Sequence, residues 1–95
     1  MTIAVVVEEK IKDGQNAAFA EYMREMIALT KEEDGCIAYD LYEAVDGSKK
    51  CVMVELWENK EKLDAHMESE HFKRLIPPAE EFKAEPSNIR VFNKL

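Results

Sequence analysis

Hydrophobic residues follow two different spacings in the first third of the chain. Residues 2–9 (TIAVVVEE) are rich in β-branched side chains and apolar on both faces at their centre, which predicts a strand inside a sheet. Residues 15–33 instead have a helical period, carried by Phe19, Met23, Met26, Ile27 and Thr30. We expect this helix to end at Asp34-Gly35, because glycine readily adopts the left-handed conformation that closes a helix.

Two further strand-like segments, residues 36–45 and 50–58, are joined by Asp46-Gly47-Ser48-Lys49, a composition typical of a hairpin turn. If Asp46 pairs with Lys49, one face of the hairpin carries Ile37, Tyr39, Leu41, Val52, Val54 and Leu56. The other face then carries Ala38, Asp40, Tyr42, Met53, Glu55 and Trp57. A shift of the register by one residue would break this sorting.

The last third of the chain predicts two short helical segments and a strand. Asn59 is a favourable N-cap for a helix over residues 60–69, in which Leu63, His66 and Met67 place His66 on the inward apolar stripe. Ser69 caps a second helical stretch with Phe72, Leu75, Ile76 and Ala79 at helical spacing. Pro77-Pro78 interrupts it, residues 79–83 add one more turn, and residues 87–94 form the last strand.

The predicted order β-α-β-β-α-β is the ferredoxin-like α+β arrangement, a four-stranded antiparallel sheet in one domain that spans residues 1–95. Helices can cover only one face of such a sheet. Met53 and Trp57 are predicted on the other face, where they would form an apolar surface exposed to water. We therefore expect a homodimer in which two copies pack sheet against sheet about a two-fold axis.

The charge of the chain restricts its partners. A formal net charge of -7 over 95 residues repels phosphate backbones and anionic lipids, so neither nucleic acid nor a membrane is expected as a partner. The apolar run Ile3–Val7 is too short for a signal peptide or a spanning helix, which favours a cytoplasmic location. Cys36 and Cys51 lie far apart in the predicted hairpin, and we expect two free thiols.

The candidate chemistry centres on His66 and His71, the two histidines of the chain. His66 is either a general base in a pocket between helix and sheet or a packing residue bonded to a backbone carbonyl. Five residues of helix turn through about 140°, and a kink intervenes, so the two histidines are not expected to share a face. Metal binding by this pair is therefore not expected, and His71 is interpreted as a capping or rim residue.

Three other residues have more than one interpretation. Trp57 could stack on an aromatic substrate or anchor the dimer face, and Tyr39 could present its hydroxyl to a ligand or pack in the core. Glu55 could be a general acid or, as we expect, form a structural ion pair with Arg90 of either subunit, and Asp40 would lie opposite Glu55 in the predicted register. The sequence has no phosphate-binding loop, dinucleotide fingerprint or C-x-x-C motif, so no cofactor is expected.

With this fold in place, the chain resembles the antibiotic biosynthesis monooxygenase family over nearly its whole length. The matching residues are Gly14, Asp34, Gly35, Cys36, Tyr39, Glu55, Trp57, Leu63, His66, Ser69, His71 and Phe72. The family consists of small dimeric α+β barrel proteins with several chemistries. Its quinol and anthrone monooxygenases oxidise aromatics with O2 and without metal or flavin, a second branch processes an autoinducer-like signal, and a third degrades haem.

The resemblance implies a cofactor-independent monooxygenase that acts on a small quinol or polyketide-type substrate with O2. His66 would be the base or orienting group, and the substrate would contact Trp57, Tyr39, Phe72, Met23, Val54 and His71. The haem branch carries other residues where this chain has Val7, His66 and Ile76, which argues against haem degradation. The alternatives are an isomerase or lyase of an oxygenated signal metabolite and a non-catalytic binding dimer. A phosphorylated substrate would need cations such as Lys73, Arg74 and Arg90.

Overall fold

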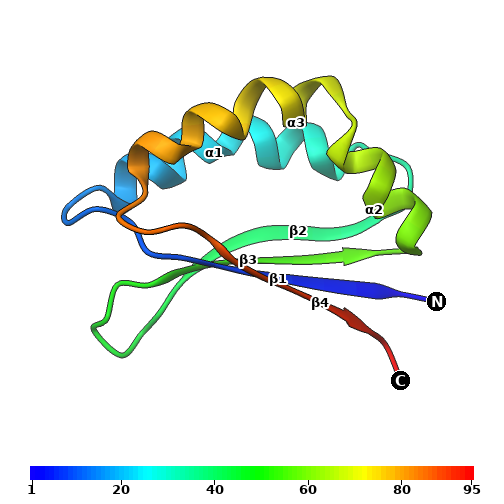
Figure 1. The fold of residues 1–95 in the computed structure, drawn as a ribbon, viewed down its shortest axis with the longest axis horizontal. Helices are drawn as coiled ribbons and strands as arrows, with labels where there is room; N and C mark the ends of the chain where they lie inside the picture. Colours follow the sequence, from blue (N-terminus) through cyan, green and yellow to red (C-terminus); the bar gives the residue numbers. More distant parts are fainter.

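The computed structural model describes residues 1–95 as a four-stranded antiparallel sheet with helices on one of its faces (Figure 1). The strands are β1 (Ile3–Glu9), β2 (Cys36–Glu43), β3 (Cys51–Trp57) and β4 (Asn88–Asn93). They lie in the order β2-β3-β1-β4, so the two strands at the centre of the sheet are β1 and β3. The element order confirms the predicted ferredoxin-like arrangement. The sheet is open, with β2 and β4 as its edges.

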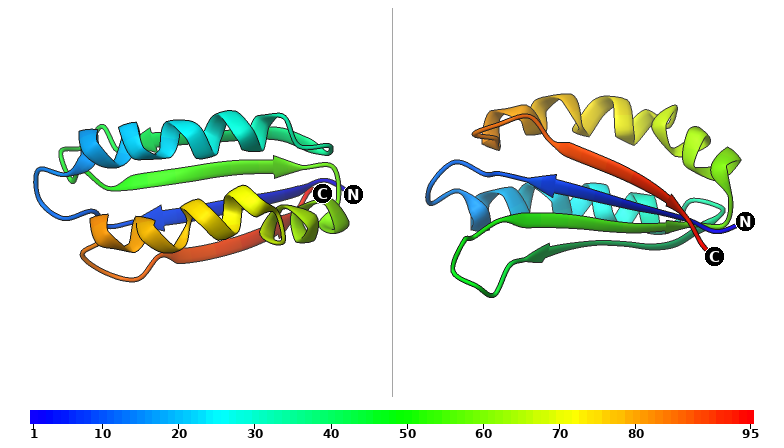
Figure 2. Two further views of the ribbon diagram at one scale, coloured as in Figure 1. Left: turned by 90° about the horizontal axis from the view of Figure 1, so that it is seen from above. Right: turned by 60° about the horizontal axis from the view of Figure 1, so that its bottom comes forward.

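The helical layer consists of α1 (Asn16–Lys31), α2 (Lys60–Met67), α3 (Glu70–Leu75) and the 3₁₀ helix η1 (Pro77–Phe82). From above, α1 runs over β2 and β3, whereas α3 and η1 run over β1 and β4 (Figure 2). The core lies between these two layers and includes Phe19, Met26 and Trp57, none of which is more than 1% exposed. No helix is long and apolar enough to pass through a membrane.

The break between α2 and α3 lies at Ser69, the N-cap of α3, and not at Pro77-Pro78. Asn59 begins α2, and its Oδ1 accepts a hydrogen bond from the backbone N–H of Lys62 at 2.9 Å. Ser69 then caps α3, where its Oγ accepts from the N–H of Phe72 at 3.2 Å. Both predicted N-caps are thereby confirmed. The chain changes direction at Ser69, so His66 and His71 belong to two separate helices.

The register of the β2–β3 hairpin differs from the prediction by one residue. Tyr39 pairs with Glu55, and Ala44 N–H donates to the carbonyl of Lys50 at 2.8 Å, which closes a five-residue loop, residues 45–49. Within this loop Gly47 and Lys49 have φ of 86° and 61°, in the left-handed region. The predicted pairing of Asp46 with Lys49 was wrong, because it implies an even, two-residue loop. The observed loop has an odd number of residues, which shifts every pair by one position relative to the prediction.

This register reverses the face predicted for β3. Met53, Glu55 and Trp57 lie on the helix-covered side with Tyr39, whereas Val54 lies on the open side opposite Asp40. The predicted placement of Val54 beside Tyr39, and of Met53 and Trp57 on the open face, was therefore wrong. The open face is apolar nevertheless, through Ala4, Val6, Val52, Val54, Leu56, Tyr42 and Phe92.

Two predicted polar contacts are also corrected by the structure. Arg90 Nη2 binds Glu8 Oε1 at 3.0 Å and does not pair with Glu55. Asp40 binds Lys31 Nζ at 2.6 Å and lies opposite Val54, not Glu55. The two cysteines are free thiols, as expected.

Candidate active site

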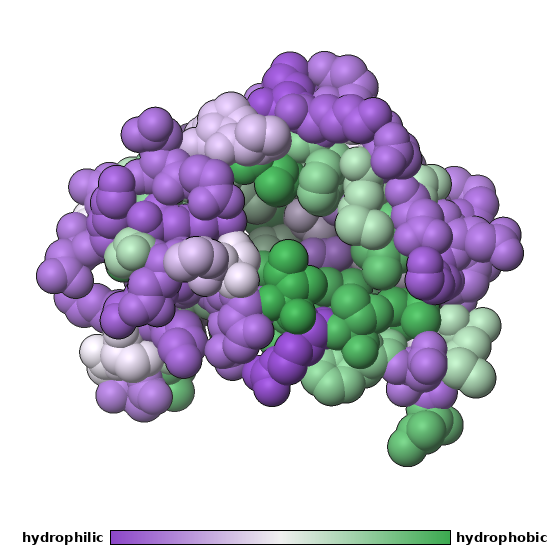
Figure 3. All heavy atoms as spheres, in the orientation of Figure 1, coloured by the Kyte–Doolittle hydropathy of each residue, from purple (hydrophilic) through white to green (hydrophobic).

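A cavity of about 280 Å³ lies between the helical layer and the covered face of the sheet. Most of its wall is apolar, including Val5, Val7, Phe19, Met23, Met53 and Ile76. Met67 and Ile89 line it as well and are 42% and 61% exposed, so they mark its opening. Figure 3 shows a hollow beneath the helices on this side, bordered by apolar residues. An apolar chamber with few polar groups is typical of small-molecule sites.

The structure separates the sequence-predicted site residues into two groups. His66, Tyr39, Phe72 and Met23 line the cavity. Val54, Trp57 and His71 do not. Val54 is on the far face of the sheet, whereas Trp57 is fully buried behind His66, at 4.7 Å between ring centroids. Trp57 is thus neither exposed on the open face nor in the cavity wall. It supports the imidazole that is in the wall.

The His66 ring is held by aromatic contacts on several sides. Besides Trp57, Phe72 and Tyr39 approach it edge-on, with centroid distances of 5.2 and 5.3 Å. The side chain is 2% exposed, which confirms the predicted inward orientation. Its Nδ1 lies 2.7 Å from Oε2 of Glu33, a residue that follows the end of α1. An ionised carboxylate only accepts hydrogen bonds, so Nδ1 carries a proton and donates it to Glu33.

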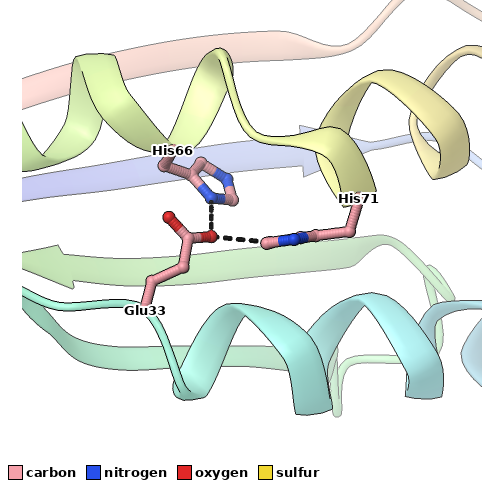
Figure 4. Close-up of side chains that lie close together, drawn as sticks. All are labelled: Glu33, His66 and His71. Carbon is pink, nitrogen blue, oxygen red and sulfur yellow. Dashed lines mark hydrogen bonds and ion pairs between the residues drawn. The ribbon is translucent and has the colours of Figure 1, made fainter.

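Glu33 also binds the second histidine. His71 Nε2 lies 2.7 Å from the same Oε2 atom, and both imidazoles point toward the carboxylate (Figure 4). The two histidines do not share a helix face, as predicted, since they belong to α2 and α3. Their convergence on one carboxylate was not predicted; the break at Ser69 directs both rings toward Glu33. His71 is in the first turn of α3, where Ser69 is the capping residue. The residue that sequence reasoning missed is Glu33, one of three consecutive acidic residues with no distinguishing local signal.

The protonation state of His66 leaves one of its ring nitrogens able to act as a base. Burial lowers the pKa of His66 below its ordinary value of 6.5, and the hydrogen bond to Glu33 opposes this effect only in part. The imidazole is therefore neutral at pH 7. With the proton on Nδ1, Nε2 keeps its lone pair and has no hydrogen-bond partner in the chain. Nε2 keeps some accessible surface, and His66 lines the cavity, so we infer that Nε2 is the atom that His66 presents there.

Glu55 is the second titratable group in the cavity wall. Its Oε1 accepts a hydrogen bond from Trp57 Nε1 at 3.0 Å, and the residue is 6% exposed. Burial raises the pKa of this carboxyl group to about 7, although the Trp57 N–H lowers it. Burial likewise raises the pKa of Tyr39, whose hydroxyl stays protonated and able to donate. The cavity thus holds a neutral imidazole, a phenol and a carboxyl group that exchanges its proton near neutral pH.

The shifted pKa of Glu55 predicts a specific dependence of stability on pH. Because the folded-state pKa of about 7 exceeds the ordinary 4.5, the folded protein binds the proton more tightly, and stability falls as pH rises from 4.5 through 7. Glu55→Gln removes this loss. We expect the free energy of unfolding of the variant to exceed that of wild type by up to ~3 kcal/mol at pH 8. The difference should shrink toward pH 4.5.

Urea unfolding curves at several pH values test this expectation. Glu58→Gln is the matched control, since Glu58 is exposed and makes no side-chain hydrogen bond or ion pair. An equal pH dependence in wild type and Glu55→Gln would contradict a buried, easily protonated Glu55.

A separate polar cluster around Glu9 lies elsewhere in the wall. Glu9 accepts hydrogen bonds from Ser87 Oγ at 2.7 and 2.9 Å, and its Oε2 lies 3.4 Å from Lys83 Nζ. Glu9 and Val5 are on the same face of β1, and Val5 pairs with Glu55. Glu9 and Glu55 are therefore separated by four residue positions, about 13 Å along the strand direction at ~3.3 Å per residue. Apolar side chains separate them.

Comparisons with known proteins agree with this fold. The family model for antibiotic biosynthesis monooxygenase matches residues 2–77. A relative in Mycobacterium tuberculosis (strain ATCC 25618 / H37Rv), named "Putative monooxygenase Rv0793", is 30% identical over 98% of this chain and 91% of its own length. Its solved structure has a TM-score of 0.90 over 100% of this chain and 96% of that chain, at 29% identity.

Two further matches extend the comparison to other organisms. The solved structure of a conserved protein from Methanosarcina mazei Go1 has a TM-score of 0.95 at 28% identity, covering 100% of this chain and 94% of that chain. An uncharacterised protein of Synechocystis sp. (strain ATCC 27184 / PCC 6803 / Kazusa), sll1783, is 26% identical over 95% of this chain. The chain spans 61% of the length of that relative.

Proposed function

Because this chain belongs to the antibiotic biosynthesis monooxygenase family, we propose that it is a cofactor-independent monooxygenase that oxidises a small electron-rich aromatic compound, a quinol or a polyketide-type phenol, with O2. The observation that carries the proposal is the state of His66. Its neutral imidazole is oriented by Glu33 through Nδ1, and its free Nε2 is in the wall of an apolar cavity.

In the proposed reaction His66 Nε2 takes the proton of a substrate hydroxyl. The resulting aryl oxide transfers electrons to O2 far more readily than the neutral phenol does. For a hydroquinone, one oxygen atom replaces a ring hydrogen, the second leaves as water, and the ring becomes a hydroxyquinone. The substrate supplies all four electrons, so no external reductant is needed. The apolar wall suits both an aromatic ring and O2, while Tyr39 and Glu55 offer hydrogen bonds to the substrate oxygens.

We also propose that the active species is a homodimer. The open face of the sheet carries a continuous apolar surface on its two central strands, flanked by Tyr42 and Phe92, which are 56% and 46% exposed. A second copy packed on this face would remove that surface from water.

The charges around the cavity weigh against a phosphorylated substrate. The only cation in the wall is Lys83, which already binds Glu9 and Glu80. Arg74 and Lys73 pair with acidic residues outside the wall. An isomerase or lyase acting on a phosphorylated signal metabolite would need free cations there.

Oxygen consumption with a panel of hydroquinones and anthrones tests the proposed function. We expect uptake of one O2 per substrate by protein freed of metal with EDTA, in the absence of flavin, with a hydroxyquinone or quinone as product. Thermal stabilisation by these compounds without oxygen uptake would instead support a non-catalytic binding protein. Absence of both effects would overturn the proposal.

A further inference from the structure

We propose that Glu33, His66 and His71 form a binding site for one divalent transition-metal ion such as Zn²⁺. This inference goes beyond the proposed oxidation, which requires no metal. One ligand atom from each residue, a carboxylate oxygen and two imidazole nitrogens, lies within 4.8 Å of the other two. Two imidazoles and one carboxylate are a donor set that Zn²⁺, Fe²⁺, Co²⁺ and Ni²⁺ accept.

The three donors are fixed by separate elements of the fold. Glu33 follows α1, His66 is in the last turn of α2, and His71 is in the first turn of α3 (Figure 4). The His66 ring is immobilised by its aromatic neighbours. Because the ligands are already oriented toward one point, binding of an ion would cost little conformational entropy compared with binding at a flexible site.

Only a small adjustment converts the hydrogen-bonded cluster into a coordination shell. Both imidazole nitrogens lie 2.7 Å from Glu33 Oε2. A tetrahedral ion with bonds of ~2.0–2.1 Å holds its ligand atoms about 3.3 Å apart. The carboxylate must therefore retreat by about 0.6 Å. The two imidazole nitrogens, which lie within 4.8 Å of one another, must adopt the same spacing. Glu33 is outside regular secondary structure and 16% exposed at its side chain, so it can make this movement.

The local charge favours a cation. The C-terminal ends of α1 and α2 direct their partial negative charge toward Glu33 and His66, and these ends outnumber the single N-terminus, that of α3, at His71. Lys31 of α1 and Lys62 of α2 are already paired, with Asp40 and Asp34 respectively, both at 2.6 Å. The Glu33 and His71 side chains keep 16% and 14% of their surface accessible, which leaves a route from solvent.

Binding of the ion changes what His66 offers to the cavity. In the hydrogen-bonded cluster the proton is on Nδ1 and Nε2 is free to accept. Coordination through Nδ1 moves the proton of the neutral imidazole to Nε2, which then donates. The ion and the base function are mutually exclusive, so metal occupancy is an inhibited state of the proposed enzyme. This last consequence alone rests on the proposed function.

Titration of the metal-free chain with Zn²⁺ and Co²⁺, followed by calorimetry and by the visible absorption of Co²⁺, tests the site without any substrate. We expect one ion per chain and the absorption of four- or five-coordinate Co²⁺. His71→Gln and Glu33→Gln should weaken binding by at least the ~10–100-fold that loss of an outer-shell partner costs. Glu32→Gln, which changes the exposed neighbouring carboxylate, should bind as wild type does.

His71→Gln leaves the buried His66 in place, so loss of binding in that variant does not depend on unfolding, and circular dichroism checks that it folds. Absence of stoichiometric binding by wild type, or equal binding by wild type and His71→Gln, would overturn the metal site. Either result would leave the oxygen-uptake experiment untouched.

Discussion

Replacement of His66 by alanine is expected to lower kcat/KM for hydroquinone oxidation by ~10²–10⁴-fold, the usual contribution of a positioned general base. The reason is that His66 is the cavity group whose pKa lies below 7 and which is therefore almost fully in its proton-accepting form at neutral pH. Tyr39 stays protonated, and Glu55 exchanges its proton near pH 7. In wild type the rate should fall on acidification below the pKa of His66, because the imidazolium cannot accept a proton.

Two measurements separate a chemical role of His66 from a structural one. The alanine variant leaves a space the size of an imidazole, so added imidazole should restore part of the activity if the ring acts as a base. Asp64→Asn, an exposed change on the same helix, should keep wild-type activity. A folded His66→Ala variant with unchanged kcat/KM would falsify the base function.

Val54→Asp is expected to convert the dimer into monomers. Val54 is on the central strand β3 of the open face, so a carboxylate there is buried without a partner when two copies pack. An uncompensated buried charge costs ~3–5 kcal/mol, and two-fold symmetry places one in each copy. The dissociation constant should therefore rise by at least ~10⁴-fold.

Sedimentation velocity across a range of concentrations measures this change. Val45→Asp introduces the same charge in the fully exposed hairpin loop and should remain dimeric. A wild-type chain that sediments as a monomer at every concentration would rule out the proposed interface.

The element order and the inward orientation of His66 could be predicted from the sequence because they depend on local patterns. The helical period of α1, the caps at Asn59 and Ser69, and the run of β-branched residues in β1 are each contained in a few neighbouring residues. Such patterns survive in the fold whenever the tertiary structure agrees with them.

The faces of β3 could not be predicted in the same way. Both faces of this strand are apolar, with Met53 and Trp57 on one side and Val52 and Val54 on the other, so alternation of polarity could not fix the register. The predicted register therefore depended on the length of the loop, and Asp46-Gly47 suggested a two-residue turn. The actual loop has five residues, and in it Lys49, a non-glycine residue, adopts positive φ, which no local pattern signals.

Glu33 escaped prediction for a different reason. It contacts His66 and His71 across separations of 33 and 38 residues, and three consecutive acidic side chains at a helix end are usually solvated. Only the break of the helix at Ser69 brings both imidazoles to the same oxygen. The site therefore depends on tertiary geometry that no local window of sequence contains.

The position of Trp57 gives the protein an optical reporter of its own chemistry. It is the single indole of the chain, and its ring is 4.7 Å from the His66 imidazole, while its N–H binds Glu55. Any event that alters the charge of either neighbour changes the electric field at the indole. The emission of the native chain can consequently follow proton movements at this centre in real time, without a dye or label.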